Sequence, residues 1–148
     1  MKLSTKGRYG LRAMIELAVS YGEDSLPLQT VAARQNISEG YLEQIMAKLK
    51  KAGLVKSIRG ANGGYFLARD PGEISVGDIL RALEGDLRAA TCSAQTGEGC
   101  ANQDICVSRY VWEKINESII NTVDTIYLDV LAQETIKLRE EHSQPKSC

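Results

Sequence analysis

The fold of this chain is decided by residues 38–53, which read SEGYLEQIMAKLKKAG. Ser38 is a favoured helix N-cap residue, Gly53 suits the position just after a helix, and apolar residues recur between them at helical spacing. We therefore expect a helix over 39–52 with an apolar inner face and polar residues facing outward. The residues of that inner face are Tyr41, Leu42, Ile45, Met46 and Leu49.

A shorter helix is predicted just before this one. Residues 29–35 have helical spacing, with Val31 and Ala32 facing inward, and Asn36-Ile37 provides a tight connection. Two short helices joined by such a turn, the second of them well capped, predict a helix-turn-helix.

A β-hairpin is predicted directly after the helix-turn-helix. Strand-like runs over 54–58 and 65–68 flank residues 59–64, RGANGG, whose glycines permit the positive φ of a tight turn. A helix-turn-helix followed by a hairpin is a winged helix. The expected fold class is therefore mainly α with a small β-hairpin wing: a winged helix-turn-helix plus a long C-terminal dimerisation helix.

Further helices are expected on both sides of this motif. The first runs over 6–21 with Thr5 as its N-cap, and Ser75 and Asp78 form a capping box that opens a helix over 76–84. Two more helical patterns, over 107–123 and 126–140, follow an irregular segment. The expected organisation is a winged-helix domain at 1–84, a cysteine-bearing loop at 85–106, dimerisation helices at 107–140 and a polar tail at 141–148.

The helix predicted over 107–123 has an apolar stripe that a solitary surface helix does not require. Packing within one chain is one explanation of this stripe. Because these residues follow a completed winged-helix core, we favour a helix pair between two subunits, and hence a homodimer. The two-fold symmetry of a dimer would match a palindromic DNA site. The residues of the stripe are Val107, Val111, Ile115, Ile119 and Val123.

Charge is divided unevenly along the chain. Residues 1–60 hold ten Lys or Arg and five Asp or Glu, a net of +5, whereas residues 61–148 carry a net of −6 within a total of −1. A basic half joined to an acidic half fits one surface for phosphates and another that keeps the duplex away, although ordinary solvated charge gives the same totals. With the winged helix, this pattern predicts double-stranded operator DNA as a partner.

Residues suited to reading DNA lie on the outward part of the 39–52 helix and on the wing. We place Gly40, Glu43 and Gln44 at the major groove, where Gln pairs with adenine and Glu accepts from cytosine. Arg59 on the thin hairpin suits a narrow minor groove. An exposed, solubilising role is the alternative for Glu43 and for each lysine. Phosphate contacts are assigned to Lys2, Lys6, Tyr9, Lys48 and Lys56.

Three cysteines, Cys92, Cys100 and Cys106, stand close together in the irregular segment. Clustered thiolates are the usual ligands of a soft metal or an iron–sulfur cluster, and in a reducing compartment they are metal ligands more often than disulfides. Their spacing is not the Cys-x-x-Cys of a zinc ribbon or a thioredoxin-type site. A loop can wrap an inorganic core larger than one ion, which favours iron–sulfur over zinc. Zinc and incidental free thiols are the alternatives.

Several classes of protein are not expected. No apolar run is long enough to span a bilayer, and no signal-peptide pattern follows the basic N-terminus, so we expect a cytoplasmic protein with no membrane partner. Residues 60–64 lack the Gly-Lys-Ser/Thr ending of a nucleotide-binding P-loop. No His is paired with a clear nucleophile motif, so neither an enzyme nor a small-molecule substrate is predicted.

Five motifs together resemble one known family, over nearly the whole chain. They are similar to the iron–sulfur cluster regulators of the IscR type, within the "Rrf-two" superfamily of winged-helix transcription factors. The motifs are MKLSTKGRY at 1–9, YLEQ at 41–44, GLV at 53–55, IRG at 58–60 and GGY at 63–65.

This resemblance implies a homodimeric transcription regulator that binds a [2Fe–2S] cluster and controls iron–sulfur cluster biogenesis genes. It implies that Glu43 and Gln44 read the major groove and that Arg59 enters the minor groove. The cluster ligands that it implies are Cys92, Cys100 and Cys106.

The chain departs from the family pattern at two positions. Gly40 stands where the pattern has Ser, and Arg109 stands where it has a His, so the fourth ligand is unassigned. The wider gap between Cys92 and Cys100 resembles nitric-oxide-sensing NsrR relatives, although Arg8 replaces their N-terminal acidic ligand. A [4Fe–4S] repressor that senses nitric oxide or redox state is therefore an alternative, as is a zinc-binding regulator. Candidates for the fourth ligand are Cys148, Glu98, Asp104, Glu113 and His142.

Overall fold

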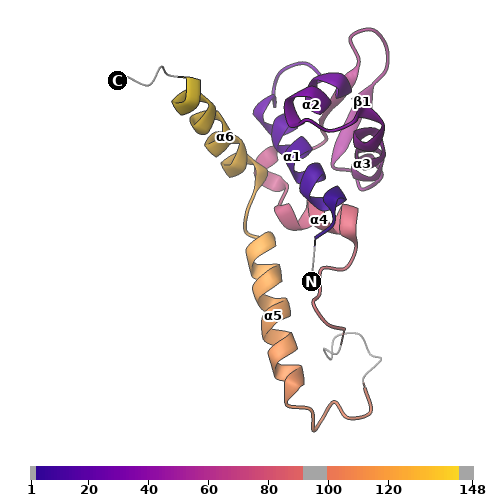
Figure 1. Ribbon diagram of the computed structural model, residues 1–148, viewed down its shortest axis with the longest axis vertical. Coiled ribbons are helices and arrows are strands. Elements are labelled where there is room, and N and C mark those ends of the chain that lie inside the picture. Colours follow the sequence, from indigo (N-terminus) through magenta and orange to yellow (C-terminus); the bar gives the residue numbers. More distant parts are fainter. Residues whose placement is uncertain (1–2, 92–99, 144–148) are drawn as a thin grey trace.

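The computed structural model describes residues 3–91 and 100–143, and within them the fold is mainly helical (Figure 1). The expected fold class is confirmed, because a helix-turn-helix leads directly into a two-stranded antiparallel hairpin. In chain order the elements are α1 (Thr5–Val19), α2 (Leu28–Gln35), α3 (Glu39–Lys51), β1 (Val55–Ile58), β2 (Gly64–Leu67), the 3₁₀ helix η1 (Pro71–Glu73), α4 (Val76–Glu84), α5 (Ser108–Val123) and α6 (Leu128–Ser143).

The helix-turn-helix is formed by local residues that end α2 and cap α3. Asn36 closes α2 in the left-handed conformation, with φ of 53°, which Asn tolerates better than most residues. Ser38 then accepts a hydrogen bond from the backbone N–H of Tyr41 and so caps α3 as predicted. The inner face of α3 is buried from Leu42 to Leu49, as its spacing indicated.

The wing is a short ladder that pairs Val55 with Leu67 and Ile58 with Gly64. Gly60 in the connection has φ of +113°, a conformation that favours glycine. The turn-side half of β2 is joined to the body by an isolated bridge between Leu26 and Tyr65, with N to O distances of 2.9 Å in both directions. This bridge was not expected, because a single residue before α2 gives no strand pattern.

The start of α1 differs from the prediction. Thr5 was expected as the N-cap, but it is already helical and Ser4 occupies the cap position without a side-chain capping bond. The hydroxyl of Ser4 instead donates to the carboxylate of Glu84 at the end of α4. A contact between residues 80 positions apart overrides the local capping preference here.

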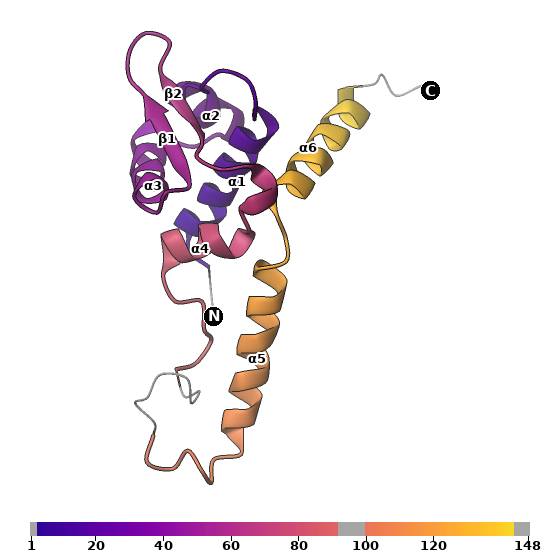
Figure 2. The same cartoon turned by 180° about the vertical axis from the view of Figure 1, so that it is seen from behind.

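The core lies where α1, α3, α4 and the start of α6 meet (Figure 2). Met14, Leu42 and Ile45 are completely buried in it, and so is Leu128 at the first turn of α6. The two helices expected within residues 107–140 are both present. They lie differently, since α5 projects away from the body whereas α6 returns to pack along α1.

The projecting helix α5 and the residue before it, Val107, expose several large apolar side chains. Val107 is 84% exposed and Val111 is 47% exposed, and Ile115 and Trp112 are also open to solvent. A bidentate ion pair between Arg81 of α4 and Asp124 holds the far end of α5 to the body. No helix among residues 3–91 and 100–143 is long and apolar enough to cross a bilayer.

Candidate nucleic-acid interface and cysteine segment

The predicted base-reading residues lie together on the outer face of α3. Gly40, Glu43 and Gln44 are all exposed, directly above the buried residues that anchor the helix. A Cβ added to Gly40 would meet no atom within 4 Å, so the backbone there accepts a larger residue as readily as glycine. The arrangement offers an amide and a carboxylate on one helix face, which is the chemistry needed at base edges.

The wing stands beside this face of α3. Arg59 is exposed at the end of β1, next to the turn of the hairpin. A groove of about 370 Å³ runs between α3 and the wing, with Glu43 on one side and Arg59 on the other. The Nζ atom of Lys50 donates to the Oγ atom of Ser57 at 2.7 Å and so ties the end of α3 to β1. The helix and the wing are therefore held as one surface.

Basic and aromatic side chains extend this surface onto the start of α1. Tyr9 contacts Tyr41 edge to face, with ring centroids 6.0 Å apart, and the guanidinium of Arg12 lies 5.4 Å from the Tyr9 ring. Lys48 of α3 lies so close to Lys6 that the neighbouring lysine lowers the pKa of Lys48. Two ammonium groups held together attract phosphates. Lys56 is exposed on the wing, and Lys2 lies outside the described residues.

Two of the three clustered cysteines fall within the described part of the chain. Cys100 and Cys106 are free, exposed thiols, whereas Cys92 lies outside the described residues. The Cys106 sulfur is 3.1 Å from the hydroxyl of Ser108 at the start of α5. That hydrogen bond, then the backbone N–H of Arg109, lowers the pKa of Cys106. The thiolate, which is the form that binds metals, is thereby favoured.

Two side chains of α5 donate to or accept from the backbone of the cysteine-bearing segment at 85–106. Asn116, which is buried, accepts from the backbone N–H of Ala89 at 2.8 Å and donates to the carbonyl of Ala90 at 3.1 Å. Arg109 donates to the carbonyl of Gln103 at 3.1 Å. Sequence reasoning assigned neither role, because a single polar residue on a helix does not reveal its partner, and the partners of Asn116 lie 26 and 27 positions away.

The candidates for a fourth ligand are placed differently. Glu113 forms an ion pair with Arg109 at 3.1 Å. Arg109, which stands where the family pattern has a His, therefore pairs with one of the carboxylates that are candidates for the fourth ligand. Asp104 is exposed beside Cys106. His142 is on α6, which lies at the opposite end of α5 from Cys100 and Cys106 (Figure 1). Glu98 and Cys148 lie outside the described residues, within which no three His, Cys, Asp or Glu side chains gather as a metal site.

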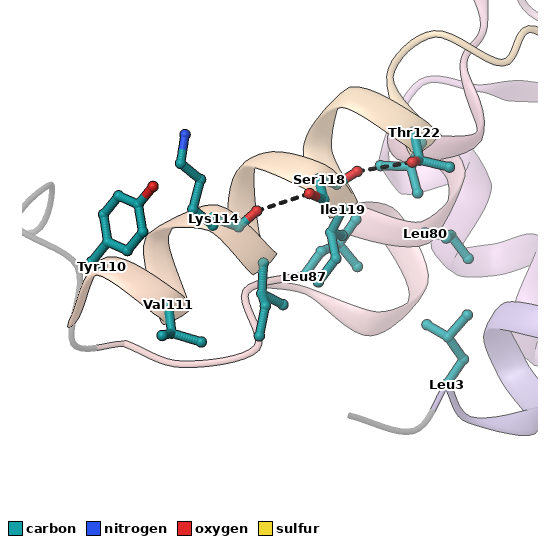
Figure 3. A pocket seen from close by; sticks show the side chains of 11 residues that line it. Leu3, Leu80, Leu87, Tyr110, Val111, Lys114, Ser118, Ile119 and Thr122 are labelled. Atoms are coloured by element: carbon teal, nitrogen blue, oxygen red, sulfur yellow. Dashed lines mark hydrogen bonds between the residues drawn. The ribbon is translucent and has the colours of Figure 1, made fainter. Parts of the chain in front are cut away.

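An apolar groove of about 610 Å³ separates α5 from α4 and the start of the chain (Figure 3). Leu80 and Leu87 lie on one side of it and Ile119 on the other, with Leu3 at its edge. Tyr110 and Lys114 line its outer end. The α5 face of this groove includes Val111, Ile115, Ile119 and Val123, four of the five residues of the predicted stripe.

Comparison with known proteins identifies the family of this winged helix. Residues 3–134 match the family described as "Rrf2: Iron-dependent Transcriptional regulator". The chain belongs to the Rrf2 family. The resemblance seen in the sequence is thereby confirmed, and so is the expectation that the protein is a DNA-binding transcriptional regulator and not an enzyme.

Rrf2 relatives of two kinds are similar to this chain. The HTH-type transcriptional regulator CymR of Bacillus subtilis is 43% identical over 135 residues, which are 91% of this chain and 92% of CymR. The HTH-type transcriptional regulator IscR of Xenorhabdus nematophila is 36% identical over 148 residues, which are 99% of this chain and 89% of that IscR.

Solved Rrf2 structures show the same two kinds. CymR of B. subtilis, described as the global cysteine regulator, superimposes with a TM-score of 0.76 at 42% identity, covering 90% of this chain and 98% of CymR. IscR of T. potens gives a TM-score of 0.72 at 44% identity, covering 99% of this chain and 94% of that IscR. The fold is therefore shared along almost its whole length with regulators of both kinds.

Proposed function

We propose that this Rrf2 protein is a dimeric cytoplasmic repressor or regulator that reads operator DNA with α3 and the wing and senses iron–sulfur cluster status through its cysteine segment. In this proposal it controls iron–sulfur cluster biogenesis genes, as the resemblance to IscR implies. The observation that carries the DNA-binding part is the common exposed face formed by Gly40, Glu43, Gln44 and Arg59.

Each part of the DNA face has its own task. Gln44 suits a bidentate contact with adenine, and Glu43 accepts from cytosine while it repels phosphate, so it discriminates between bases. Arg59 enters the minor groove from the wing. Lys6 and Lys48 contact the phosphate backbone and set the position of the helix without specifying a sequence.

A second copy of the chain is the proposed partner along α5. The exposed stripe and the groove between α4 and α5 leave apolar surface that a facing α5 would bury. Burial of such surface contributes about 25 cal/mol per Å². The resulting two-fold axis relates two copies of α3, which fits a palindromic operator.

The proposed cofactor is a [2Fe–2S] cluster held by Cys92, Cys100 and Cys106, with [4Fe–4S] or zinc as alternatives. The described thiols fit such a group, because Cys100 and Cys106 are free and exposed and the thiolate form of Cys106 is favoured. A bound cluster supplies a group whose gain and loss report iron and sulfide supply. Glu113 is ion-paired with Arg109, whereas Asp104 is exposed two residues before Cys106.

A second candidate function is regulation in response to cysteine without a bound cluster. The similarity to CymR, described as the global cysteine regulator, favours it. Sensing of nitric oxide or redox state through a bound cluster is the third candidate function.

Anaerobic purification separates these functions. The leading proposal predicts brown protein with visible absorption bands and bound iron and sulfide, and a variant with Ser at all three clustered cysteines should lose both. Colourless parent protein would favour the CymR-like function, and stoichiometric zinc would favour the zinc-binding alternative. Titration of the brown protein with nitric oxide, followed by an operator-binding assay, distinguishes a nitric-oxide sensor from a sensor of cluster supply.

The DNA-binding part is tested with a duplex recovered by the parent protein from a random-sequence library. Gln44→Ala should weaken binding to this duplex at fixed salt by about 1–3 kcal/mol. Unchanged affinity would remove Gln44 from the DNA face.

A further inference from the structure

We propose that Glu84, the last residue of α4, is a positioning residue for DNA binding, because its carboxylate fixes the start of α1 against the recognition helix α3. The inference rests on the proposed DNA face of α3. It adds a residue that touches no DNA in that proposal and that gives no motif in the sequence.

The contacts of Glu84 replace a complete capping box. Its Oε1 atom accepts hydrogen bonds from the backbone N–H of Ser4 at 2.9 Å and from the backbone N–H of Gly7 at 3.1 Å. The same atom accepts a third hydrogen bond from the hydroxyl of Ser4. In a capping box the N-cap and third helical residues satisfy these two N–H groups with each other's side chains. Here Ser4 and Gly7 hold those two positions, and one carboxylate from another helix satisfies both groups.

The glycine at position 7 belongs to this arrangement. A Cβ added to Gly7 would lie 2.5 Å from the Oε1 atom of Glu84, so a side chain there would displace the carboxylate. With glycine at the third helical position the local sequence cannot form a complete capping box, and Glu84 supplies the missing acceptor. A negative charge at a helix N-terminus is also favoured by the helix dipole.

The fixed end of α1 touches the recognition helix directly. The Oγ1 atom of Thr5, between Ser4 and Gly7, lies 2.9 Å from the hydroxyl oxygen of Tyr41. One turn later, the ring of Tyr9 packs edge to face against the same Tyr41. Tyr41 is in the first turn of α3, next to Gly40 and two residues before Glu43. A shift at the start of α1 is therefore passed to the base-reading end of α3.

The charge of Glu84 also bears on the basic pair at this end of α1. Lys6 lowers the pKa of Lys48, whereas the negative charge of Glu84 acts in the opposite direction. The pKa of Glu84 is itself lowered, first by the Ser4 hydroxyl and also by the backbone N–H groups and by Lys6. An ionised carboxylate beside two ammonium groups reduces their mutual repulsion, which helps to keep both on the phosphate-facing side.

Two substitutions separate the hydrogen bonds from the charge. Glu84→Gln removes the charge but keeps an amide oxygen that can accept from Ser4 and Gly7, whereas Glu84→Ala removes both. Both variants remove the negative charge of Glu84, so any gain in affinity for DNA from the loss of that charge is the same in both. We expect Glu84→Ala to bind the selected duplex more weakly than Glu84→Gln, by roughly 2- to 30-fold at fixed salt. Equal affinities of the two variants would overturn the proposal.

A double-mutant cycle tests the route through Tyr41. Tyr41→Phe removes the hydroxyl that contacts Thr5 and keeps the ring. If Glu84 acts by holding Thr5 in place, Tyr41→Phe should cost less affinity in the Glu84→Ala background than in the parent, because coupled residues are not additive. Fully additive losses would show that Glu84 does not act through this contact.

Stability and the DNA face are controlled separately. Binding is measured at a temperature far below the unfolding midpoint of each variant. If Glu84→Ala does not fold, amide exchange at Ser4 and Gly7 is measured in Glu84→Gln instead. Exchange of these amides as fast as in an unfolded chain would overturn the positioning role of Glu84. Glu73→Gln, which removes an exposed carboxylate on η1, should bind as the parent does. If Gln44→Ala loses affinity while Glu84→Ala binds as tightly as Glu84→Gln, the positioning role alone is overturned, whereas no loss with Gln44→Ala overturns the proposed DNA face.

Discussion

The completely buried carboxylate of Glu16 on α1 is paired with the guanidinium of Arg139 on α6. The same carboxylate accepts from Arg34 at 3.3 Å and from Gln35 at 2.6 Å, both at the end of α2. The C-terminal helix is thus joined to the first helix of the helix-turn-helix through one buried charge. A buried carboxylate is tolerated only when it is paired and hydrogen bonded, as it is here.

Removal of Arg139 should destabilise the fold. Arg139→Ala leaves the Glu16 carboxylate with Arg34 and Gln35 only, and because the Arg139 side chain is 47% exposed we expect a loss of about 1–2 kcal/mol in the free energy of unfolding. Lys137→Ala, at an exposed position of the same helix, is the matched control and should change the free energy by less than about 0.5 kcal/mol. Urea unfolding measures both, and equal effects of the two variants would contradict the role of the pair.

A substitution in the first turn of α6 tests whether this helix is part of the hydrophobic core. Leu128→Ala should cost about 2–5 kcal/mol in the free energy of unfolding, because Leu128 is fully buried and its removal leaves a cavity. Leu138→Ala is the control on the same helix, since Leu138 is 52% exposed and should lose less than about 0.5 kcal/mol. Thermal or urea unfolding of both variants decides whether α6 belongs to the core.

The wing makes a prediction about operator affinity. Arg59→Ala should weaken binding to the selected duplex by about 1–3 kcal/mol, because the guanidinium is the group proposed to enter the minor groove. Arg69→Ala removes an equal charge just after β2, at the other end of the hairpin from the turn, and should have a smaller effect. Titrations of the two variants at one salt concentration compare them, and an Arg69 effect as large as that of Arg59 would count against specific insertion.

The ion pair between Arg81 and Asp124 should make stability depend on acid pH. The guanidinium of Arg81 lowers the pKa of Asp124, so the paired carboxylate stabilises the fold above the ordinary Asp pKa, and this stabilisation is lost as pH falls through the lowered value. Asp124→Asn should therefore be less stable than the parent at neutral pH by about 0.5 kcal/mol, the usual size for a part-exposed pair. The difference should shrink as the solution is acidified. Thermal unfolding of both proteins across pH measures it, and a constant gap would contradict this origin.

Asn116 should control the order of the segment that leads to the cysteines. Asn116→Ala leaves the N–H of Ala89 and the carbonyl of Ala90 without their partner, and loss of about 1–1.5 kcal/mol of hydrogen bonding corresponds to roughly tenfold faster amide exchange at Ala89. Asn121→Ala, at an exposed position of the same helix, should leave that exchange rate unchanged. Amide exchange of the two variants reads out the difference.

The sequence predicted those elements whose cause is local. The helix over 76–84 was predicted with its observed bounds, because Ser75 and Asp78 form a complete capping box within four residues. The bounds of α2, α3 and the wing strands agree within one residue for the same reason, since turn and cap residues mark them. The α3 residues that are proposed to read bases were predicted to face outward, and helical spacing alone is enough to predict that exposure.

Contacts between distant residues could not be predicted in this way. Glu84, Asn116 and Arg139 each satisfy polar groups far away in the sequence, and a lone polar residue on a helix gives no sign of its partner. The burial of Leu128 was hidden for a related reason, because α6 has only a weak apolar stripe and its contact with α1 depends on how the chain turns at 124–127. The cysteine site stays a prediction, as Cys92 lies outside the described residues.

The burial of Leu128 has a consequence for synthesis of the chain. The core of the body that carries α3 and the wing is closed by Leu128, which is synthesised after Cys92, Cys100, Cys106 and the whole of α5. A nascent or truncated chain that stops before α6 therefore exposes an open core and is a substrate for chaperones and proteases. A stable proposed DNA face is therefore expected only in chains that already contain Cys92, Cys100 and Cys106.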